Sequence, residues 1–547
     1  MKKSGSSKTL SLVCALALAM TTFAGCGSGS QTSSDSASSP SPVSAASGSD
    51  LSKHVTFTMS MIDSEKAGKN ADGSEAENLK WLEKKFNFDI KPQALTWNNY
   101  IDQTRLWLTA GNAPDLIMLD IAPTRYSEFT QWVDDGLFKA YPDLSKYPNL
   151  KKRLDGMLTG KKFMIDNTLY AWPAYIDNQQ NDYKKIDGYL YRKDWAQTVG
   201  LDQPDGIFTQ DQWINLVKAV VQKDPGKNGA GKTIGMLTEG IYQFPLYFGV
   251  NGISPYLQRY VKNSSGQWVW GPTLPESAKA VKQIKQWYDD GLIWKDQILG
   301  KGDTGKRFEN GLAFSCVEEN VTVPGLDLAT NDFKKAFPDL DPSKVFGFAM
   351  VKGADGKFTV YQSSDQWSQT AMNASIDDEK ASRWCEILDY LVSDEGYYFR
   401  GFGIPGKDWT MGSDGKPVIQ WKKDASGNYV APYASDGTWP WSRTASALDL
   451  QSLSSPAFPQ WERDMVQNAY NIQNKYASDV NLIKLDPDLE YFQGANYNKI
   501  GNDEAEVYTV IEKLMTSKNV ESDWNAWVQS KKGQIQPALD ELNSKLK

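Results

Sequence analysis

The sequence has very few residues of the two kinds on which metal binding and nucleophilic catalysis most often depend. Among its 547 residues there is one histidine, His54, and there are four cysteines. Zinc sites and catalytic Ser–His or Cys–His pairs use such side chains, so the composition nearly excludes them. No apolar run after the N-terminal leader reaches the ~18 residues that a membrane-spanning helix needs. We therefore expect no resident metal, no cofactor and no transmembrane segment in the body of the chain.

Acidic residues outnumber basic ones, and tryptophan is abundant. Lysine and arginine total 59 against 67 acidic residues, a formal net charge of −8. Nucleic acids demand a basic face, so this balance argues against a nucleic-acid partner. The chain has 20 Trp, 25 Tyr and 21 Phe. Their flat apolar faces with polar edges suit stacking on the C–H face of a sugar ring, although most of these side chains must build the core.

The N-terminus carries a secretory leader. A lysine-rich start precedes the apolar core Leu10–Met20, and the small pair Ala24-Gly25 forms a cleavage site. This core is about half the ~20 residues of a spanning helix, so we predict that residues 1–25 are a removed signal peptide. Cys26 follows directly and resembles the cysteine of a bacterial lipobox, whose thiol is diacylated, with palmitate for example, and becomes the new N-terminus. The alternative is an ordinary secretory signal with an incidental cysteine.

Residues 26–50 form a tether. Beyond Cys26 the segment is almost wholly Ser, Gly, Ala, Thr and Pro and has no aromatic residue. It has too little apolar surface to fold, so it behaves as a flexible coil that spans ~25–30 Å on average. The sequence thus predicts a lipid anchor, a flexible tether and a folded body at the outer face of the cell membrane.

The folded body is long enough for more than one core. Roughly 500 residues follow the tether, which predicts two or more lobes. Strand patterns at 55–61, 88–95 and 114–120 alternate with helical patterns, which is typical of a parallel α/β sheet. Asp120 ends the third strand, and open α/β sheets bind ligands beyond the carboxyl ends of strands. A helix-capping or turn role for Asp120 is the alternative.

Local signals predict further details. Thr209 and Thr273 each precede a Gln or Glu by three residues, so two helices should begin in capping boxes. Cys385 lies on an apolar stripe of helical spacing. We expect Cys385 and Cys316 to be buried free thiols, with a disulfide between them as the alternative.

Several segments, taken in order, resemble one known family. They are Leu108-Thr-Ala-Gly-Asn-Ala-Pro-Asp115, Leu169-Tyr-Ala-Trp-Pro173, Tyr191-Arg-Lys-Asp-Trp195 with Gly200, Leu201 and Pro204, Tyr288-Asp-Asp-Gly-Leu-Ile293, Phe308-Glu-Asn-Gly311, and Leu388-Asp-Tyr-Leu-Val-Ser-Asp-Glu-Gly396 with Tyr397, Gly403, Ile404 and Gly406. In order and spacing these segments resemble the extracellular solute-binding proteins of ABC sugar importers, in their large Gram-positive lipoprotein subgroup.

The resemblance implies a fold and a function. The fold is the two-lobed periplasmic-binding-protein fold with a hinge and discontinuous lobes. We place residues 51–176 with 317–405 in the N-terminal lobe, and 177–316 with 406–547 in the C-terminal lobe. The function is that of a non-catalytic, monomeric receptor. It would bind a carbohydrate, most readily an oligosaccharide, between the lobes and deliver it to the transmembrane subunits of an ABC permease.

Candidate ligand contacts are aromatic and polar residues near lobe crossings or loops. They are Asp120, Trp172, Tyr175, Arg192, Tyr242, Trp367, Trp439, Trp441 and Arg443. Arg192 recurs in the family segment, and an ion pair with Asp194 that stabilises a lobe is its alternative role. Some family members carry a calcium loop. Here Gly226 and Gly235 stand where an EF-type loop needs oxygen ligands, so we predict a plain turn at 224–229.

Two other functions stay open on the sequence. A surface glycoside hydrolase or lyase needs two carboxylates ~5–10 Å apart, a separation that sequence does not reveal. A peptide or metal receptor of similar fold is the other alternative, although the single histidine and the many tryptophans disfavour it.

Overall fold

The structure is a computed structural model of the 547-residue chain. It describes residues 49–62, 69–70, 73–96, 98–121, 125–176, 184–186, 188–237, 260–295, 304–318, 323–362, 364–425, 427, 429–433, 444–448, 455–500 and 504–546. The leader, Cys26 and most of the tether lie outside the described residues. None of the described helices has the length and apolarity that crossing a bilayer requires.

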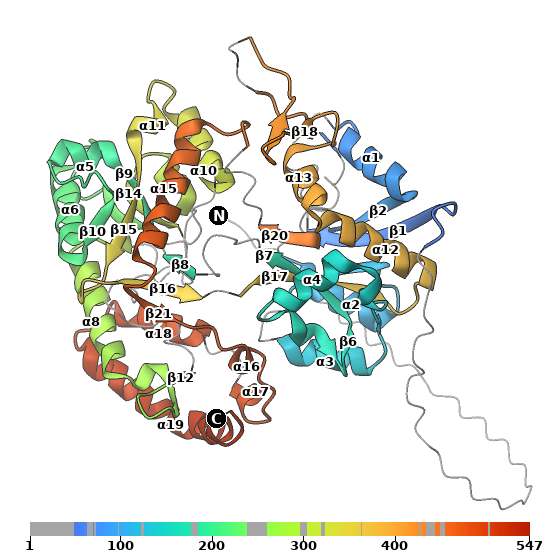
Figure 1. The fold of residues 1–547 in the computed structure, drawn as a ribbon. Coiled ribbons are helices and arrows are strands. Elements are labelled where there is room, and N and C mark those ends of the chain that lie inside the picture. Colours follow the sequence, from blue (N-terminus) through green and yellow to red (C-terminus); the bar gives the residue numbers. More distant parts are fainter. Residues whose placement is uncertain are drawn as a thin grey trace, which may run out of the picture. The chain divides into compact units, whose positions relative to one another are not determined.

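Seven described strands form the first sheet, in the order β2-β1-β3-β17-β7-β20 with β4 beside β17 (Figure 1). Strands β1, β2 and β3 are parallel, as their alternation with helices predicts, and β17 runs antiparallel to both β3 and β7. The predicted α/β class is confirmed. The strands are β1 Val55–Ile62, β2 Phe88–Leu95, β3 Leu116–Leu119, β4 Phe138–Lys139, β7 Ala171–Ile176, β17 Gln366–Asn373 and β20 Ser446–Leu448.

Helices cover the first sheet and bury one core with it; we call the sheet and these helices the first-sheet region. They are α1 Glu77–Phe86, α2 Tyr100–Ala110, α3 Tyr126–Asp134, α4 Pro148–Gly156, α12 Asp378–Leu391 and α13 Asp394–Phe402. Trp384 of α12 is fully buried and its ring meets Phe57 of β1 edge-on at 6.0 Å. Cys385, the next residue, is a buried free thiol as predicted. Cys316 forms no disulfide, but its predicted burial is wrong, because it is only partly buried.

Five described strands form the second sheet, in the order β10-β15-β9-β14-β11. Strand β9 runs antiparallel to β14 and β15, and the outer strands are parallel to their neighbours. Trp213 fills the centre of the core on this sheet, and its ring stacks on Tyr189 at 4.7 Å. The strands are β9 Gly188–Arg192, β10 Ile207–Thr209, β11 Ile234–Leu237, β14 Ala313–Glu318 and β15 Phe346–Lys352.

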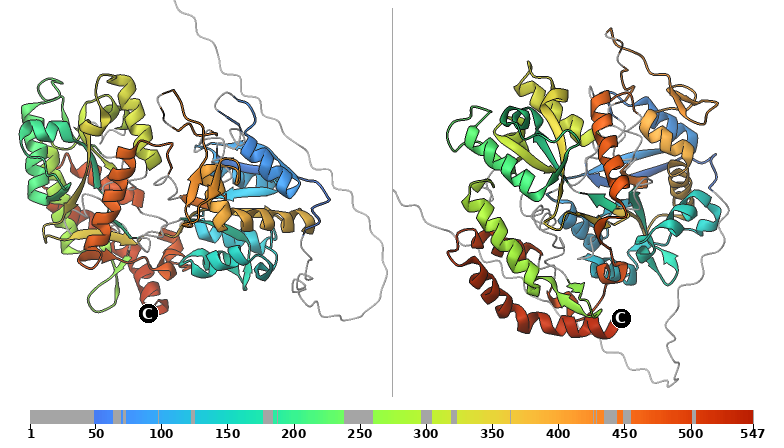
Figure 2. Two further views of the ribbon diagram at one scale, coloured as in Figure 1. Left: turned by 45° about the horizontal axis from the view of Figure 1, so that its top comes forward. Right: turned by 60° about the vertical axis from the view of Figure 1, so that its left-hand side comes forward.

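The second-sheet region is this sheet with the helices that pack around it. They are α5 Lys193–Val199, α6 Gln210–Lys223, α8 Pro275–Asp289, α9 Thr304–Glu309, α10 Val323–Ala336, α11 Pro342–Val345, α15 Gln460–Tyr476, α16 Pro487–Glu490, α17 Tyr497–Ile500, α18 Glu504–Leu514 and α19 Val520–Lys545. Helices α8 and α19 run side by side in every view (Figure 2). Both bury residues in the same core as Trp213.

One of the two predicted capping boxes is confirmed. The Thr209 hydroxyl accepts the Gln212 backbone N–H, and the Gln212 side chain accepts that of Thr209. The other is wrong, because α8 begins at Pro275 and the Thr273 hydroxyl instead donates to the Trp270 carbonyl. Proline is favoured at the first helical position, and it moves the helix start past Thr273.

A small three-stranded sheet, in the order β21-β16-β8, lies where the chain passes between the two regions. Its strands are β8 Lys184–Ile186, β16 Phe358–Gln362 and β21 Val480–Ile483. Along the chain, β8 stands between β7 of the first sheet and β9 of the second, and β16 stands between β15 and β17. The two crossing strands are paired antiparallel. Such pairing gives two crossings one common axis about which a hinge can bend.

Sheet membership departs from the predicted lobe boundaries at two places. Strand β15 lies within 317–405 but pairs with β9 and β10 of the second sheet. Strand β20 lies within 406–547 but pairs with β7 of the first sheet. The sequence of a strand indicates that the strand is buried, but it does not indicate which distant strand it pairs with. Local sequence patterns therefore could not predict which sheet β15 and β20 join.

The remaining described strands are the paired segments β5 Met164–Ile165 and β6 Thr168–Leu169, β12 Tyr260–Lys262 and β13 Trp268–Trp270, and β18 Trp409–Met411 and β19 Pro417–Ile419.

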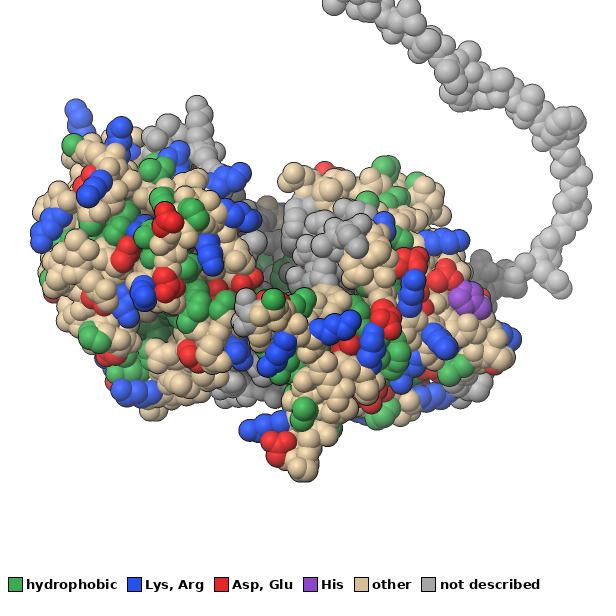
Figure 3. Space-filling model, turned by 90° about the horizontal axis from the view of Figure 1, so that it is seen from above, with side chains coloured by type: hydrophobic (Ala, Val, Ile, Leu, Met, Phe, Trp, Pro, Cys, Tyr) green, Lys and Arg blue, Asp and Glu red, His purple; other side chains and the backbone are tan. Residues whose placement is uncertain are grey.

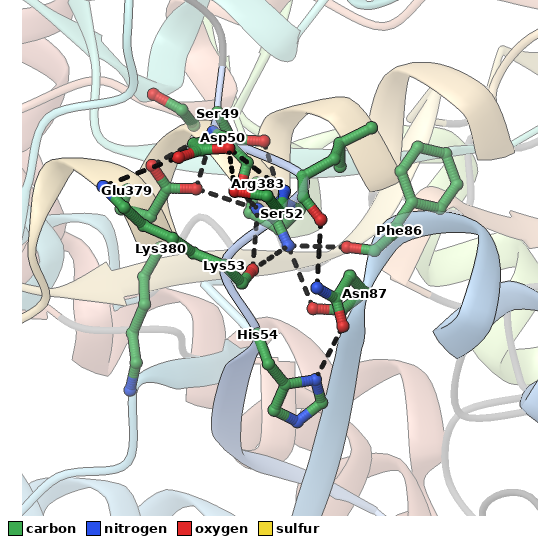
Figure 4. A network of polar contacts seen from close by, with 12 residues as sticks. Ser49, Asp50, Ser52, Lys53, His54, Phe86, Asn87, Glu379, Lys380 and Arg383 are labelled. Carbon is green, nitrogen blue, oxygen red and sulfur yellow. Dashed lines mark hydrogen bonds and ion pairs between the residues drawn. The ribbon is translucent and has the colours of Figure 1, made fainter.

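Arg383 of α12 holds the first described residues against the first sheet (Figure 4). Its guanidinium is fully buried and donates to the carbonyls of Asp50, Phe86 and Asn87 at 2.7, 2.6 and 3.0 Å. It also donates to the Glu379 carboxylate at 2.8 Å. A buried guanidinium needs such acceptors in several directions, and here they come from three separate chain segments. We call this group of contacts the Arg383 clamp.

Candidate ligand-binding site

The strands of the first sheet bring several chain turns to one edge. The carboxyl ends of β1, β3 and β7 meet the amino end of β17 there, because β17 alone of these four runs in the opposite direction. The chain moves from β1 to β2 on one side and back to β3 on the other, so the strand order reverses at β1. Such a reversal is where open α/β sheets bind ligands. The segments that follow these strands, 63–68, 122–124 and 177–183, lie outside the described residues.

Three polar side chains meet directly after β3. The Tyr100 hydroxyl donates to Asp120 Oδ2 at 2.6 Å, and Arg125 Nη2 lies 3.0 Å from the same oxygen. Arg125 Nε also donates to the Asp120 carbonyl at 2.9 Å. Both charged side chains keep about a fifth of their surface exposed, 19% for Asp120 and 20% for Arg125. We call these residues the Tyr100–Asp120–Arg125 group.

The group offers both acceptors and donors to a ligand. Burial, and then the hydrogen bond to Asp120, raises the pKa of Tyr100 to about 12, so its hydroxyl stays protonated near neutral pH. Tyr100 donates to Asp120 Oδ2 and Arg125 forms its ion pair with the same oxygen, and none of the described residues donates to Oδ1. A carboxylate oxygen held in this way can accept a hydrogen bond from a ligand hydroxyl.

Trp367 lies at the amino end of the neighbouring strand β17. Its ring is half-buried and packs against the edge of the first core. Between Gln366 and Gln369 the register of β17 against β7 shifts. Such an irregularity re-aims a side chain, and here it falls on Trp367. Trp367 is thus only partly buried, and an indole ring is suited to stack on a sugar ring.

Two buried glutamines support this edge from behind. Gln369 Oε1 accepts the backbone N–H of Ile121 at 2.7 Å, which fixes the main chain directly after Asp120. Gln369 Nε2 donates to Gln366 Oε1 at 2.5 Å, and Gln366 Nε2 donates to the Tyr491 hydroxyl at 2.9 Å. Paired amides in a buried strand hold their positions tightly, because an unpaired one would be costly.

Two predicted contacts, Trp172 and Tyr175 of β7, are buried instead. Trp172 has no exposed surface and lies within the first core. Tyr175 is 2% exposed, with the Arg153 guanidinium 4.6 Å from its ring centroid and an Arg400 Nη2 donating to its hydroxyl at 3.1 Å. In this conformation both rings support the sheet and neither presents a face for stacking. The position of Trp172 and Tyr175 next to a lobe crossing in the sequence did not reveal that both side chains belong to the core.

Arg192 lies at the edge of the second sheet where β15 begins, which is opposite the edge where β14 and β15 end. It pairs in register with Phe346, the first residue of β15, whereas the carboxyl ends of β14 and β15 lie towards the start of β9. Arg192 is 5% exposed and donates through Nε and Nη2 to both carboxylate oxygens of Asp194, at 2.8 and 2.6 Å. Its guanidinium also lies 4.4 Å from the Trp195 ring centroid. The structure therefore favours the lobe-stabilising ion pair over a ligand contact.

The other predicted residues, Tyr242, Trp439, Trp441 and Arg443, lie outside the described residues, as does Cys26. Along the chain, Tyr242 is in the segment that follows β11 at the carboxyl edge of the second sheet. Trp439, Trp441 and Arg443 precede β20. Their ligand contacts stay predictions.

The turn at 224–229 is closed by hydrogen bonds of the protein itself. The Asp224 carboxylate accepts the backbone N–H groups of Asn228 and Gly229 at 3.0 and 2.8 Å and the hydroxyl of Thr233. These bonds, with the Thr233 hydroxyl first, lower the pKa of Asp224. In the part of the chain that the structure describes, no three His, Cys, Asp or Glu side chains are grouped to hold a metal ion.

Sequence reasoning missed Tyr100, Arg125 and Tyr491 at this edge. Tyr100 and Arg125 lie near Asp120 only because α2 and α3 begin beside the end of β3. Gln366 and Gln369 did leave a signal, since two glutamines are unusual within one mostly buried strand. Tyr491 lies more than 120 residues from its partner Gln366 and left none.

Comparison with known proteins extends the resemblance stated from the sequence. No family model matches the chain. Two proteins of Bacillus subtilis (strain 168), "Lipoprotein LipO" and "Polygalacturonan/rhamnogalacturonan-binding protein YtcQ", are each 25% identical to it, over 350 and 345 residues. These matches cover 62% and 61% of this chain and 64% of each relative, so the chain spans less than two thirds of either relative's length.

Solved structures share the fold over most of the chain. The alginate-binding protein AlgQ2 superposes with a TM-score of 0.61 at 16% identity, covering 89% of this chain and 97% of that protein. The substrate-binding protein FusA of S. pneumoniae, in complex with kestose, gives 0.60 at 15% identity, with coverage of 89% and 97%. The resemblance to solute-binding lipoproteins and the two-lobed fold class are confirmed. The similar structures are substrate-binding proteins and not enzymes.

Proposed function

We propose, starting from this kinship with solute-binding lipoproteins, that the chain is an extracellular, lipid-anchored receptor for an ABC sugar importer. The receptor binds an oligosaccharide between two lobes, which correspond to the first-sheet and second-sheet regions, and delivers it to the permease. The lobe boundaries follow sheet membership, with residues 55–176 and 366–448 in one lobe and 188–352 and 455–546 in the other. Strands β8 and β16 form the hinge.

The observation that carries this proposal is the Tyr100–Asp120–Arg125 group at the carboxyl edge of the first sheet, beside the half-buried Trp367. Sugars present hydroxyls around an apolar C–H face, and their receptors answer with charged acceptors and donors around an aromatic ring. The group combines a negative and a positive charge 3.0 Å apart. It can therefore bond the hydroxyls of neutral sugars, and Arg125 can also turn towards a ligand carboxylate.

The names of similar proteins support the ligand class. One curated relative is named for binding polygalacturonan and rhamnogalacturonan, and similar structures are named for alginate and kestose. Basic and acidic side chains are interspersed over the face seen in Figure 3, which suits a small polar ligand better than a nucleic acid.

Calorimetry tests the proposal directly. The full-length mature chain is titrated with oligogalacturonides, alginate oligomers, kestose and a neutral glucan oligomer, with a hexapeptide as the control. Binding of at least one sugar with micromolar or tighter affinity is expected. Heat from the peptide alone would favour a peptide receptor and reject the carbohydrate assignment.

A glycoside hydrolase or lyase is the second candidate, and the described carboxylates at this edge disfavour it. Asp365 is fully buried and accepts bonds from the backbone N–H of Leu158 and from both N–H and hydroxyl of Thr159. Asp120 Oδ2 is already paired with Tyr100 and Arg125. A glycosidase needs two carboxyl groups that flank the scissile bond, whereas Asp365 has no exposed surface to offer a sugar. Chromatography of each sugar after incubation decides the point, since shortened chains would establish catalysis.

The anchor is proposed from Cys26. Lipidation of its thiol would keep the receptor beside its permease at the cell surface, at high local concentration. Cys26→Ser is expected to release the protein into the medium and abolish sugar uptake while calorimetric affinity stays unchanged. A fall in affinity would show that the anchor and the binding site are not separable.

A further inference from the structure

One short segment places side chains in both cores. Residues 487–490 form α16, and Leu489 and Phe492 are 8% and 9% exposed in the core of the second-sheet region. Tyr491, between them, is 6% exposed in the core of the first-sheet region. A chain that alternates between two cores in this way is fixed to both. We call residues 486–497 the strap; α16 and α17 mark it in Figure 1.

Tyr491 is held firmly in the first-sheet region. Its ring meets Tyr126 edge-on at 5.1 Å and Phe163 at 5.9 Å, and its hydroxyl accepts the hydrogen bond from Gln366. Burial raises the pKa of the Tyr491 hydroxyl well above its usual range, so the group stays protonated. Next to it, Asp488 forms an exposed ion pair with Lys162 at 2.7 Å. The buried hydroxyl is the polar contact here that solvent screens least.

The other end of the strap is tied to α19. The Glu541 carboxylate accepts the backbone N–H groups of Ala495, Asn496 and Tyr497 at 3.1, 2.8 and 3.0 Å. Gly494 leaves no room for a side chain, because a Cβ there would lie 2.4 Å from Glu541 Oε2. The strap is therefore tied to the second-sheet region, and buried Tyr491, together with the exposed Asp488–Lys162 ion pair, joins it to the first-sheet region.

From Tyr491 a chain of three hydrogen bonds leads to the candidate site. Gln366 donates to Tyr491 at 2.9 Å, Gln369 donates to Gln366 at 2.5 Å, and the Ile121 backbone N–H donates to Gln369 at 2.7 Å. Gln366 and Gln369 are 6% and 0% exposed. Ile121 directly follows Asp120, and Trp367 directly follows Gln366. A displacement of the strap would therefore reach both predicted ligand contacts through bonds that are costly to leave unpaired.

We propose that Tyr491 is a positioning residue that couples the arrangement of the two regions to the geometry of the sugar site. Its hydroxyl fixes the orientation of the Gln366 and Gln369 amides, and through them the main chain that carries Asp120. This inference rests on the proposed function for its ligand, but its effect on the free protein does not.

The test compares two variants that each remove one buried hydroxyl bonded to β17. Tyr491→Phe loses the bond from Gln366. Tyr141→Phe is the matched control, since the Tyr141 hydroxyl is also buried and donates to the β17 carbonyl of Thr370 at 2.7 Å, within the first-sheet region. Gln366→Met removes the other partner of the same bond, so the test stands even if one variant fails to fold.

The first measurement needs no ligand. Spin labels on Leu106→Cys of α2 and Leu201→Cys after α5, both exposed sites, report the distance between the regions by double electron–electron resonance in a Cys26→Ser, Cys316→Ser background. Tyr491→Phe and Gln366→Met are expected to broaden or shift the distance distribution, and Tyr141→Phe to leave it unchanged. An unchanged distribution in Tyr491→Phe, or an equal change in Tyr141→Phe, would overturn the proposal.

The second measurement is calorimetric titration with the oligogalacturonide trimer, or with whichever sugar of the panel gives heat with the unmodified protein. Tyr491→Phe is expected to weaken the affinity about three- to tenfold, the loss typical of one hydrogen bond, and Tyr141→Phe to keep it. Equal affinities in all three proteins would reject the coupling to the site. If the unmodified protein binds no sugar, the proposed function fails, while the distance measurement still decides the role of Tyr491.

Discussion

The two sheet regions each hold an Arg–Asp pair beside a strand end, and the two arginines have different surroundings. Arg192 and Asp194 lie at the amino edge of β15 in the second-sheet region, with the guanidinium buried against Trp195. Arg125 and Asp120 lie at the carboxyl edge of the first sheet and are each about a fifth exposed. Both pairs satisfy the same chemistry of guanidinium and carboxylate, so the pairing itself does not identify a binding site.

The difference is one of position and access. At the carboxyl edge several strands end together, and a ligand can compete for a carboxylate oxygen. At the amino edge the Arg192 side chain is 6% exposed, and its two bonds to Asp194 satisfy the carboxylate on both oxygens. The comparison therefore supports the proposal that Arg192 stabilises its region and that Asp120 contacts the ligand, and the experiments that follow can break or sharpen it.

The largest effect is expected for Arg192→Met. The variant loses two charge-assisted hydrogen bonds and should lower the free energy of unfolding by about 3 kcal/mol, measured by urea unfolding. Asp194 keeps 32% of its surface exposed, so its charge is not left buried. Sugar affinity of the folded variant should not change. Arg125→Met is the matched variant and should cost less, about 1 kcal/mol, because both members of its pair keep about a fifth of their surface exposed. Similar losses in the two variants would remove the distinction between the pairs.

Glu462 is a buried carboxyl group that, unlike Asp194 and Asp120, forms no ion pair with an arginine among the described residues. It is 1% exposed, and its Oε1 accepts the Thr330 hydroxyl at 2.8 Å. Burial, and then neighbouring Asp327, raises the pKa of Glu462 to about 7, above the ordinary value of 4.5. The folded protein therefore favours protonated Glu462. This contribution to the free energy of unfolding is present in full below pH 4.5 and is lost as the pH rises through 7.

Glu462→Gln imitates the protonated form and should stabilise the protein at pH 8 by up to about 3 kcal/mol. At pH 4 the variant and the unmodified protein should unfold at the same urea concentration. Glu541→Gln gives the opposite sign, because the Lys545 amine and the backbone N–H groups lower the pKa of Glu541 to about 2, so that variant should lose stability at pH 7. An E462Q gain that is the same at both pH values would contradict the titration.

Asp120→Asn should weaken sugar binding about tenfold or more, since charge-assisted hydrogen bonds contribute about 1.5–3 kcal/mol. Stability should change by less than about 1 kcal/mol, because the residue is partly solvated. Asp102→Asn, whose side chain is 87% exposed on α2, is the control and should leave both quantities unchanged. Unchanged sugar affinity in D120N would contradict the proposal that the binding site lies at the end of β3.

The smallest effect is expected for Trp367→Ala. Loss of one stacking face should weaken sugar affinity about fivefold, which corresponds to about 1 kcal/mol. Trp172→Phe on the neighbouring strand should instead lower the melting temperature and leave affinity unchanged, because Trp172 is fully buried. The reverse pattern, with Trp172 controlling affinity, would restore the sequence-based assignment of that residue.

Local sequence patterns predicted what local interactions determine. The β-α-β-α-β order, the strand directly before Asp120 and the capping box at Thr209 depend on neighbouring residues, and all three are present, although the strand is Leu116–Leu119 and not 114–120. The second capping box failed because Pro275 outweighs Thr273 within the same few residues.

What the sequence did not predict depends on contacts between distant segments. Strand β15 joins the second sheet through β9, which lies more than 150 residues away, and Trp172 is buried by side chains from several such segments. The family segment containing Arg192 was correctly singled out, but its position at the amino edge follows only from strand pairing. A candidate site therefore gains most from knowing which sheet edge each residue occupies.

The Arg383 clamp has a mechanical consequence. A pull on the chain at Ser49 first meets the backbone bonds that the carboxylates of Glu386 and Glu379 accept from Ser49 and Asp50, at 2.8 and 2.9 Å. Behind them lies β1, which is bonded to parallel strands on both sides and would have to slide rather than peel. Bonds loaded together in shear resist force far better than bonds opened one after another. Drag on the folded body at a cell surface would thus be borne by the first sheet as a whole, without unravelling the end at which the load is applied.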